Sequence, residues 1–440
     1  MRICILAAGA GGMYCGSCLR DNALAGALRR AGHDVALLPL YTPLRTDTDN
    51  HSTGRVFYGG VNACLQHATR LFRHTPRWID WLLDRHWLLK LAGRIGARSS
   101  PADLGGLTLS ILEGERGPQQ KELRRLIRFA KTELRPQVVS LPNLMFIGMA
   151  RLLRQELGVP VVCELTGEDI FLDALQEPER SRAREIIRQR ATDVARFVAT
   201  SDYYAHRMTD YLSIDLERID VVCPGITRDL IKPACSNRAD ARPTIGYLAR
   251  LCPEKGLDRL VEAFVRLRQM PGMQQARLRV AGYLGPAHRD WYANLRSSVR
   301  RQGLDGCFEH VGEVDFPGKR AFLDSIDILC VPTCYAEPKG IYVLEALARS
   351  VPAVLPDHGA FGELARRTGG VLLVAPGDAG ALAAGLARLL SDRLTRLEMG
   401  RRGREAVRDA FTDDCMAAKM LAVYEDVLNE HRPGPDSALT

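Results

Sequence analysis

Residues 335–348 read Tyr-Ala-Glu-Pro-Lys-Gly-Ile-Tyr-Val-Leu-Glu-Ala-Leu-Ala, a short loop that runs directly into a helix and carries two glutamates, Glu337 and Glu345. The preceding residues 326–332 form a short, mostly apolar run with β-branched side chains that ends at a proline, a pattern that predicts a buried parallel strand. Glu337 is therefore expected at the carboxyl end of a strand, where open α/β sheets bind ligands.

The helix predicted from Ile341 to Arg349 begins beside a glycine. Gly340 allows the backbone to approach a ligand closely, and the N–H groups of the first turn, at Ile341 and Tyr342, lack partners within the helix. Such a helix start attracts phosphate. The two glutamates can accept hydrogen bonds from hydroxyls on either side of a bound diphosphate. The stretch therefore predicts a binding site for a sugar nucleotide.

The spacing of Glu337 and Glu345, followed by Ala-Leu-Ala, resembles the E-x7-E signature of the family 4 glycosyltransferases. Two glutamates on a solvated helix face are common, but further segments follow in this family's order, which favours the resemblance. They are Ile-Gly-Tyr-Leu-Ala-Arg at 245–250, Pro-Glu-Lys-Gly at 253–256, Val-Ala-Gly at 280–282, Gly-Ala-Phe-Gly-Glu at 359–363 and Gly-Gly-Val-Leu-Leu-Val-Ala-Pro-Gly-Asp at 369–378. The N-terminal half matches less specifically.

The resemblance implies an α/β protein of the GT-B fold, with two Rossmann-like, doubly wound domains and a cleft between them. It also implies an enzyme that moves a hexose from a UDP- or GDP-sugar to an acceptor hydroxyl, with retention of anomeric configuration. In such an enzyme Glu337 would hold sugar hydroxyls near the reacting carbon. Glu345 would accept the ribose hydroxyls, and the loop at 357–363 would face the nucleotide and sugar.

The length of 440 residues also predicts two domains, because it is too long for one ordinary core. The polar residues 227–242 show no periodicity and contain a proline, which indicates a linker. We expect an acceptor-binding domain at 1–228, a linker at 229–242, a nucleotide-sugar-binding domain at 243–411, a helix at 412–432 that crosses back to the first domain, and a tail at 433–440.

Two cations bracket a turn at the end of the strand predicted around 245–249. Arg250 ends that strand and Lys255 begins the next helix, so both can converge on one pyrophosphate. The alternative is two solvated side chains. With Glu337 they are the expected catalytic residues, because they can stabilise the charge that develops on a departing diphosphate. No Asp-x-Asp lies in a fitting loop, so neither a metal nor another cofactor is expected beside the nucleotide sugar.

The N-terminus predicts a strand at 2–8, a glycine turn at 9–12, a helix at 17–31 and a strand at 33–40. This βαβ unit resembles the glycine loop that opens two-domain glycosyltransferases, and it places Gly11 and Gly12 at the donor. A purely structural turn is the alternative. The third position of a dinucleotide fingerprint is Tyr14 rather than glycine, which disfavours a nicotinamide cofactor.

Glu168 and Asp169 follow a strand predicted at 159–166, where many relatives carry a histidine close to the sugar. That departure puts a histidine role in doubt. Either carboxylate is a candidate to orient an acceptor hydroxyl, and capping of the helix predicted at 170–175 is the alternative. Cys15 and Cys18 form a CxxC at a helix start, which lowers a thiol pKa, so a redox role is a further hypothesis; chance occurrence among twelve cysteines is the alternative.

The composition indicates which kinds of partner the protein binds and in which cell compartment it works. The net charge of +8 is modest and suits anionic substrates, and no nucleic-acid motif is present. Scattered cysteines and the lack of a long apolar run predict a cytoplasmic protein. Residues 77–91 combine apolar and basic side chains at helical spacing, which fits peripheral membrane contact. The acids Asp80 and Asp84 favour internal packing of that helix instead.

Other functions fit parts of the same pattern. A sugar-nucleotide epimerase or hydrolase on this fold would need an acid/base pair and no acceptor. A non-catalytic regulator that binds nucleotide sugars would keep the phosphate contacts without transfer. A thiol sensor would use the CxxC pair. Sugar transfer to an acceptor, compared with hydrolysis and with binding alone, distinguishes these classes.

Overall fold

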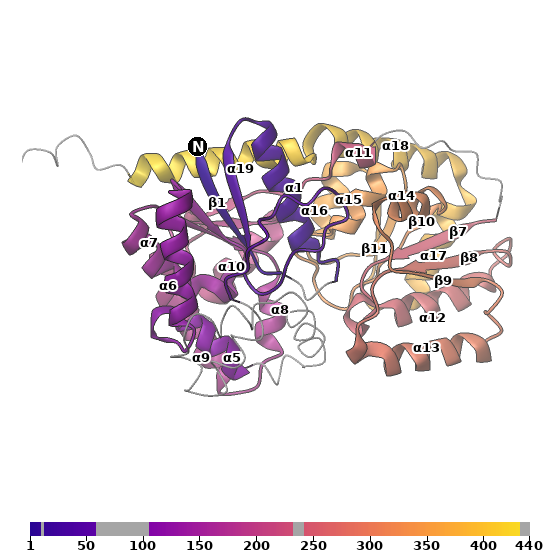
Figure 1. The fold of residues 1–440 in the computed structure, drawn as a ribbon. Coiled ribbons are helices and arrows are strands. Elements are labelled where there is room, and N and C mark those ends of the chain that lie inside the picture. Colours follow the sequence, from indigo (N-terminus) through magenta and orange to yellow (C-terminus); the bar gives the residue numbers. More distant parts are fainter. Residues whose placement is uncertain (10–12, 59–104, 232–241, 432–440) are drawn as a thin grey trace, which may run out of the picture. The chain divides into compact units, whose positions relative to one another are not determined.

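The computed structural model describes residues 1–9, 13–58, 105–231 and 242–431 (Figure 1). The chain divides into two compact units, one of residues 1–223 with 414–440 and the other of residues 224–413. The first unit thus ends before the expected boundary at 228. Helix α11 (Arg228–Ile231) occupies the start of the expected linker, most of which, like the tail, lies outside the described residues.

The first unit is built on a parallel six-stranded sheet in the order β2-β1-β3-β4-β5-β6. Its strands are β1 (Arg2–Ala7), β2 (Asp34–Pro39), β3 (Val138–Leu141), β4 (Val161–Leu165), β5 (Arg196–Ala199) and β6 (Ile219–Val221). Its α-helices are α1 (Gly16–Arg30), α5 (Gly105–Leu112), α6 (Gln120–Phe129), α7 (Ala150–Leu157), α8 (Glu168–Asp173), α9 (Glu179–Arg190), α10 (Asp202–Leu212) and α19 (Asp413–His431).

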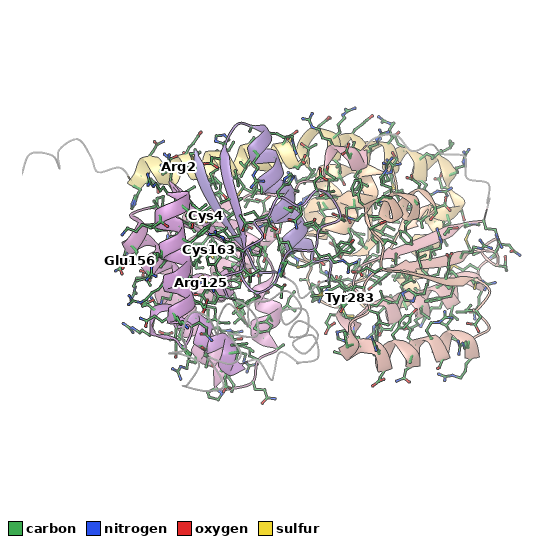
Figure 2. The ribbon with its side chains drawn as sticks, in the orientation of Figure 1. Arg2, Cys4, Arg125, Glu156, Cys163 and Tyr283 are labelled. Carbon is green, nitrogen blue, oxygen red and sulfur yellow. The ribbon has the colours of Figure 1, made fainter. Side chains whose placement is uncertain are left out.

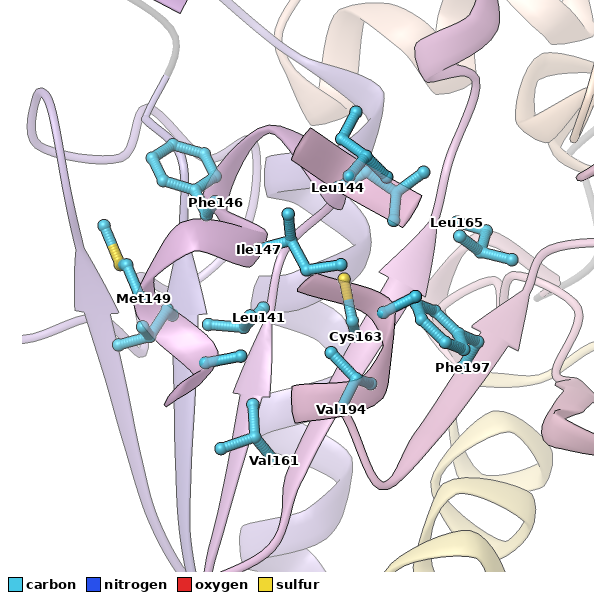
Figure 3. Close-up of a cluster of buried hydrophobic side chains, with 14 of the residues drawn as sticks. Leu141, Leu144, Phe146, Ile147, Met149, Val161, Cys163, Leu165, Val194 and Phe197 are labelled. Atoms are coloured by element: carbon cyan, nitrogen blue, oxygen red, sulfur yellow. The ribbon is translucent and has the colours of Figure 1, made fainter. Parts of the chain in front are cut away.

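Alternating side chains of these strands form a core on each face of the sheet, because successive residues of a strand point to opposite faces. Cys4 and Leu6 of β1 pack in one cluster, and Ile3 and Ile5 in the other. Figure 3 shows part of the first cluster, where strand residues meet the turn after β3. Its labelled members include Leu141, Phe146, Ile147, Val161, Cys163 and Phe197.

The C-terminal helix α19 belongs to the second of these clusters. Met416, Met420, Tyr424 and Val427 are buried among residues of α1 and the sheet. The last helix of the chain therefore completes the core of the first unit.

The second unit contains another parallel six-stranded sheet, in the order β12-β11-β10-β7-β8-β9. Two parallel, doubly wound sheets confirm the predicted α/β class. The strands are β7 (Thr244–Leu248), β8 (Arg277–Ala281), β9 (Phe308–Gly312), β10 (Ile328–Leu329), β11 (Ala353–Pro356) and β12 (Val371–Val374). The remaining α-helices are α12 (Leu257–Arg268), α13 (Arg289–Arg301), α14 (Phe316–Asp324), α15 (Ile341–Ala348), α16 (Phe361–Thr368), α17 (Ala379–Ser391) and α18 (Arg393–Ala410).

The strand and the helix on either side of Glu337 form where the sequence predicts them, but both are shorter than predicted. Helix α15 begins at Ile341, as expected, and ends at Ala348, one residue before the expected end at Arg349. Strand β10 is limited to Ile328–Leu329 within the predicted run 326–332. The chain turns soon after β10 because Pro332 has no N–H to donate and the N–H of Thr333 donates to the carbonyl of Val331, at 3.0 Å.

The cysteines are thiols wherever the structure describes them. Cys4 and Cys163, labelled in Figure 2, lie among the apolar side chains of the first unit, and burial raises the pKa of both, to about 12 for Cys4. Within the described part of the chain, no helix has the length and apolar character needed to cross a bilayer.

Candidate functional site

Three of the predicted site residues, Arg250, Lys255 and Glu337, lie where the strand order of the second sheet reverses. Strand β7 lies between β8 and β10: β8 and β9 follow on one side of it, and β10, β11 and β12 follow on the other. Ligands of open α/β sheets bind at the carboxyl ends of strands at such a switch point. The loop after β7 carries Arg250 and Lys255, and the loop after β10 carries Glu337.

The turn that carries Lys255 is held against the loop after β10. Gly256 has φ +71°, and a Cβ there would lie 1.9 Å from the carbonyl oxygen of Pro332, so the close approach requires glycine. The N–H of Cys334 donates to the carbonyl of Glu254 at 2.8 Å. These contacts join two loops that are far apart in the sequence.

Lys255 reaches Glu337 across this junction. Its Nζ lies 2.6 Å from Glu337 Oε2, and the two side chains are 11% and 3% exposed. The same ammonium lies 5.0 Å from the ring centre of Tyr335 and 5.1 Å from that of Tyr342. Two predicted catalytic residues therefore form one buried ion pair between aromatic rings.

Glu337 accepts hydrogen bonds from both tyrosine hydroxyls. Tyr335 donates to Oε2 at 3.2 Å and Tyr342 donates to the same oxygen at 3.1 Å, while the N–H of Gly340 makes a long contact of 3.4 Å with Oε1. The carboxylate therefore lies at the start of α15, whose N-cap is Gly340 with φ +65°. The sequence analysis did not predict these two hydroxyl contacts. The positions of Tyr335 and Tyr342 on either side of Glu337 in the sequence could have indicated them.

Burial alone would raise the pKa of Glu337, but the charge of Lys255 and its hydrogen bond, with smaller contributions from Lys339 and Tyr342, lower it to about 2. Burial and the Glu337 charge raise the pKa of Tyr335 well above its usual range. Glu337 is thus an ionised hydrogen-bond acceptor, and the tyrosines stay protonated as donors.

The depressed pKa of Glu337 predicts a pH-dependent contribution to stability. The folded value of about 2 lies below the ordinary 4.5, so the contribution is complete above pH 4.5 and is lost as the pH falls through about 2. Urea unfolding of the wild type and of Glu337→Gln across this range should show a stability difference that shrinks on acidification. A difference that stays constant down to the lower pH would contradict the assigned ionisation.

The backbone of Glu337 is fixed by the loop after β11. The N–H of Ala360 donates to the carbonyl of Glu337 at 2.8 Å. Gly359 has φ +59°, and a Cβ there would lie 2.5 Å from the Glu337 nitrogen. The segment 359–363, expected near the donor, therefore packs directly behind this glutamate.

Arg250 lies exposed at the end of β7, and its backbone is fixed by Tyr247, whose hydroxyl donates to the Arg250 carbonyl at 3.0 Å. Its charge opposes the rise in the pKa of Tyr335, the ring that also borders Lys255. The structure thus brings both predicted cations to the surroundings of Tyr335.

Glu345 has a different partner from Glu337. It lies inside α15, and its Oε1 accepts from Nζ of Lys319 at 2.6 Å; the side chains are 13% and 11% exposed. Lys319 belongs to α14 and was not predicted as a site residue. No local pattern marks it, since the pairing depends on how α14 and α15 lie together.

Glu168 and Asp169 lie in the first unit and hold local structure. Glu168 accepts from the N–H and hydroxyl of Thr166, from the N–H of Gly167 and from the hydroxyl of Tyr204. Asp169 accepts from the same hydroxyl at 2.9 Å and from Arg207 at 3.2 Å. Helix α8 begins at Glu168, so neither caps a helix at 170–175, and an acceptor contact stays a prediction.

The structure describes the Cys15–Cys18 pair but not the other predicted sites near the N-terminus. Gly11, Gly12 and the segment 77–91 lie outside the described residues. Helix α1 begins at Gly16 with Cys15 as N-cap. A hydrogen bond with Cys15, and burial, raise the pKa of Cys18 far above its usual range, so the expected lowering of a thiol pKa at this helix start is wrong for Cys18.

A separate cavity of about 300 Å³ lies at the ends of β10, β11 and β12. Its lining includes Arg259, Thr333 and Asp378, and also His358 from the loop 357–363 that was expected to face the nucleotide and sugar. Arg250, Lys255, Glu337 and Glu345 do not line it.

Two family models match the chain: one described as a glycosyl transferase 4-like domain covers residues 21–225, and one described as glycosyl transferases group 1 covers residues 231–406. D-inositol 3-phosphate glycosyltransferase of Kribbella flavida is 27% identical over 332 residues, 68% of this chain and 76% of that protein.

Solved structures of similar architecture cover nearly the whole chain. Sucrose-phosphate synthase of Thermosynechococcus elongatus matches 97% of this chain and 99% of its own, with a TM-score of 0.72 and 18% identity. Anabaena HepE, solved in complex with UDP-glucose, matches 96% of this chain and 99% of its own, with a TM-score of 0.66 and 15% identity. At these low sequence identities, the similarity shows a shared fold and nothing about activity.

Proposed function

Because this chain belongs to the family 4 glycosyltransferases and has their GT-B fold, we propose that it transfers a hexose from a nucleoside diphosphate sugar to an acceptor hydroxyl with retention of configuration. The observation that carries the proposal is the buried Lys255–Glu337 pair, 2.6 Å apart at the switch point of the second sheet. It joins a cation suited to diphosphate with a carboxylate suited to sugar hydroxyls.

In this proposal the difficult step is departure of the nucleoside diphosphate. Lys255 and Arg250 stabilise the negative charge that develops on the phosphates, and the first turn of α15 adds the positive end of its helix dipole. An ammonium has three N–H donors, so Lys255 can keep its hydrogen bond to Glu337 while it also donates to a phosphate oxygen.

Glu337 then acts by position and charge. As an ionised carboxylate it accepts bonds from sugar hydroxyls while positive charge develops at the reacting carbon, so it need not attack that carbon itself. The acceptor oxygen enters on the face that the diphosphate vacates. The departing phosphate takes the proton of the acceptor hydroxyl, so that the bond to the donor phosphate breaks as the new glycosidic bond forms.

The experiment that tests this proposal is a mass-spectrometric binding screen of the protein against UDP- and GDP-hexoses, followed by transfer assays with the donor that binds. Product formed only with an acceptor supports transfer. Free sugar or an isomerised donor as the sole product would assign a hydrolase or an epimerase instead. Binding without any product would assign a regulator.

We expect transfer to continue in EDTA, because the Lys255 and Arg250 side chains supply the positive charge at the diphosphate. Initial rates with and without chelator should agree within about twofold, since these two side chains take the place of a metal ion in stabilising the departing diphosphate. The matched control adds magnesium or manganese back to the chelated enzyme. Activity lost in EDTA and restored by either ion would contradict this part of the proposal.

A further inference from the structure

Two ion pairs join α14 to α15 and to Arg349, the residue that caps the end of α15. Lys319 Nζ lies 2.6 Å from Glu345 Oε1. Further along, Arg349 binds Asp324 through two parallel contacts of 2.8 Å, Nε to Oδ1 and a terminal nitrogen to Oδ2. One of these pairs therefore includes a predicted donor residue, Glu345, and the other does not.

The start of α14 places Lys319. Asp315 caps the helix by accepting from the N–H of Gly318 at 2.9 Å, and the N–H of Lys319 donates to the Asp315 carbonyl at 2.7 Å. Lys319 is only 8% exposed as a residue. Lysine is almost never buried to this degree unless it is paired, so its position is tied to Glu345.

We propose that Lys319 is a positioning residue for the donor ribose: it orients the Glu345 carboxylate from the α14 side so that this carboxylate accepts the ribose hydroxyls. The inference rests on the proposed function, in which Glu345 contacts the ribose. A carboxylate has about four lone-pair sites. The contact with Lys319 at Oε1 occupies one of these sites.

Docking of the two helices does not by itself require the Lys319 pair. The Arg349 side chain is 1% exposed, makes both contacts with Asp324 and also donates to the carbonyl of Leu230 at 3.0 Å. This bidentate pair already fixes α14 against α15. Lys319 instead places a cation beside Glu345, the carboxylate of α15 that we propose to contact the ribose.

The test compares binding of UDP and GDP with binding of their 2′,3′-dideoxy forms. In the wild type, loss of the hydroxyls should weaken binding by roughly tenfold or more, as expected for hydrogen bonds to a charged group. Lys319→Met should bind both forms with nearly equal affinity, as should Glu345→Gln. Asp324→Asn, which breaks the neighbouring pair of the same helices, should keep the full dependence on the hydroxyls.

The outcomes separate this inference from the proposed function. If Glu345→Gln loses the dependence on ribose hydroxyls while Lys319→Met keeps it, the positioning role is overturned and the ribose contact of Glu345 stands. If Glu345→Gln keeps the dependence, the ribose contact and the positioning role both fail.

A purely structural role predicts a different result. Lys319→Met and Asp324→Asn would then lower the melting temperature and weaken both nucleotide forms to the same degree, which would also overturn the inference. Should Lys319→Met fail to fold, Lys319→Gln keeps a hydrogen-bond donor without the charge and is expected to lose part of the hydroxyl dependence. Full dependence in that variant would count against the charge of Lys319 as the orienting element.

Discussion

Lys255→Met is expected to weaken binding of free UDP or GDP by about 10- to 150-fold, because a charge-assisted contact of about 1.5–3 kcal/mol is lost. The same change should destabilise the protein. It leaves Glu337, which is 2% exposed, without the cation that lies 2.6 Å away, and breaking a buried ion pair from one side costs about 3–5 kcal/mol. Nucleotide titration and thermal unfolding measure the two effects.

Two further variants separate the effects. Lys255→Met combined with Glu337→Gln removes the uncompensated charge and should recover much of the stability without recovering affinity. Arg250→Ala removes an exposed cation and should lose affinity with little change in melting temperature. Wild-type diphosphate affinity in both Arg250→Ala and Lys255→Met would refute the phosphate assignment.

Glu337→Gln is expected to lower kcat by roughly two orders of magnitude while nucleotide binding changes little. The amide keeps the size of the side chain but weakens the bonds to sugar hydroxyls that strengthen as positive charge develops, and losing one such charge-stabilising contact costs about 100- to 1000-fold. Steady-state transfer kinetics and binding of free nucleoside diphosphate provide the two measurements.

Glu345→Gln is the matched comparison, because it makes the same chemical change eight positions further along the chain, inside α15. Its contact with the ribose exists whether or not a sugar is attached, so the donor KM should rise and free nucleoside diphosphate should bind less tightly, with kcat largely kept. The opposite pattern, in which Glu337→Gln loses nucleotide affinity and Glu345→Gln loses only turnover, would reverse the placement of the two carboxylates along the donor.

Local sequence determined the elements that carry this site. The apolar run before Pro332 specified a strand end, and Gly340 with the residues after it specified the start of α15, because strand and helix periods and the special conformations of proline and glycine act over a few residues. The order of short segments from 245 to 378 also indicated the family. The positions of Arg250, Lys255 and both glutamates followed from these local features.

Only the tertiary structure decided which charges meet. Lys255 pairs with Glu337 across 82 positions of sequence, and Lys319 pairs with Glu345 across 26. Each pairing depends on which strands are neighbours and on how a turn packs, as at Gly256 against Pro332. A local pattern specifies the period and ends of an element but not its neighbours. The ionised state of Glu337 and the part played by Lys319 therefore came from packing between distant segments, since burial and charge act through space.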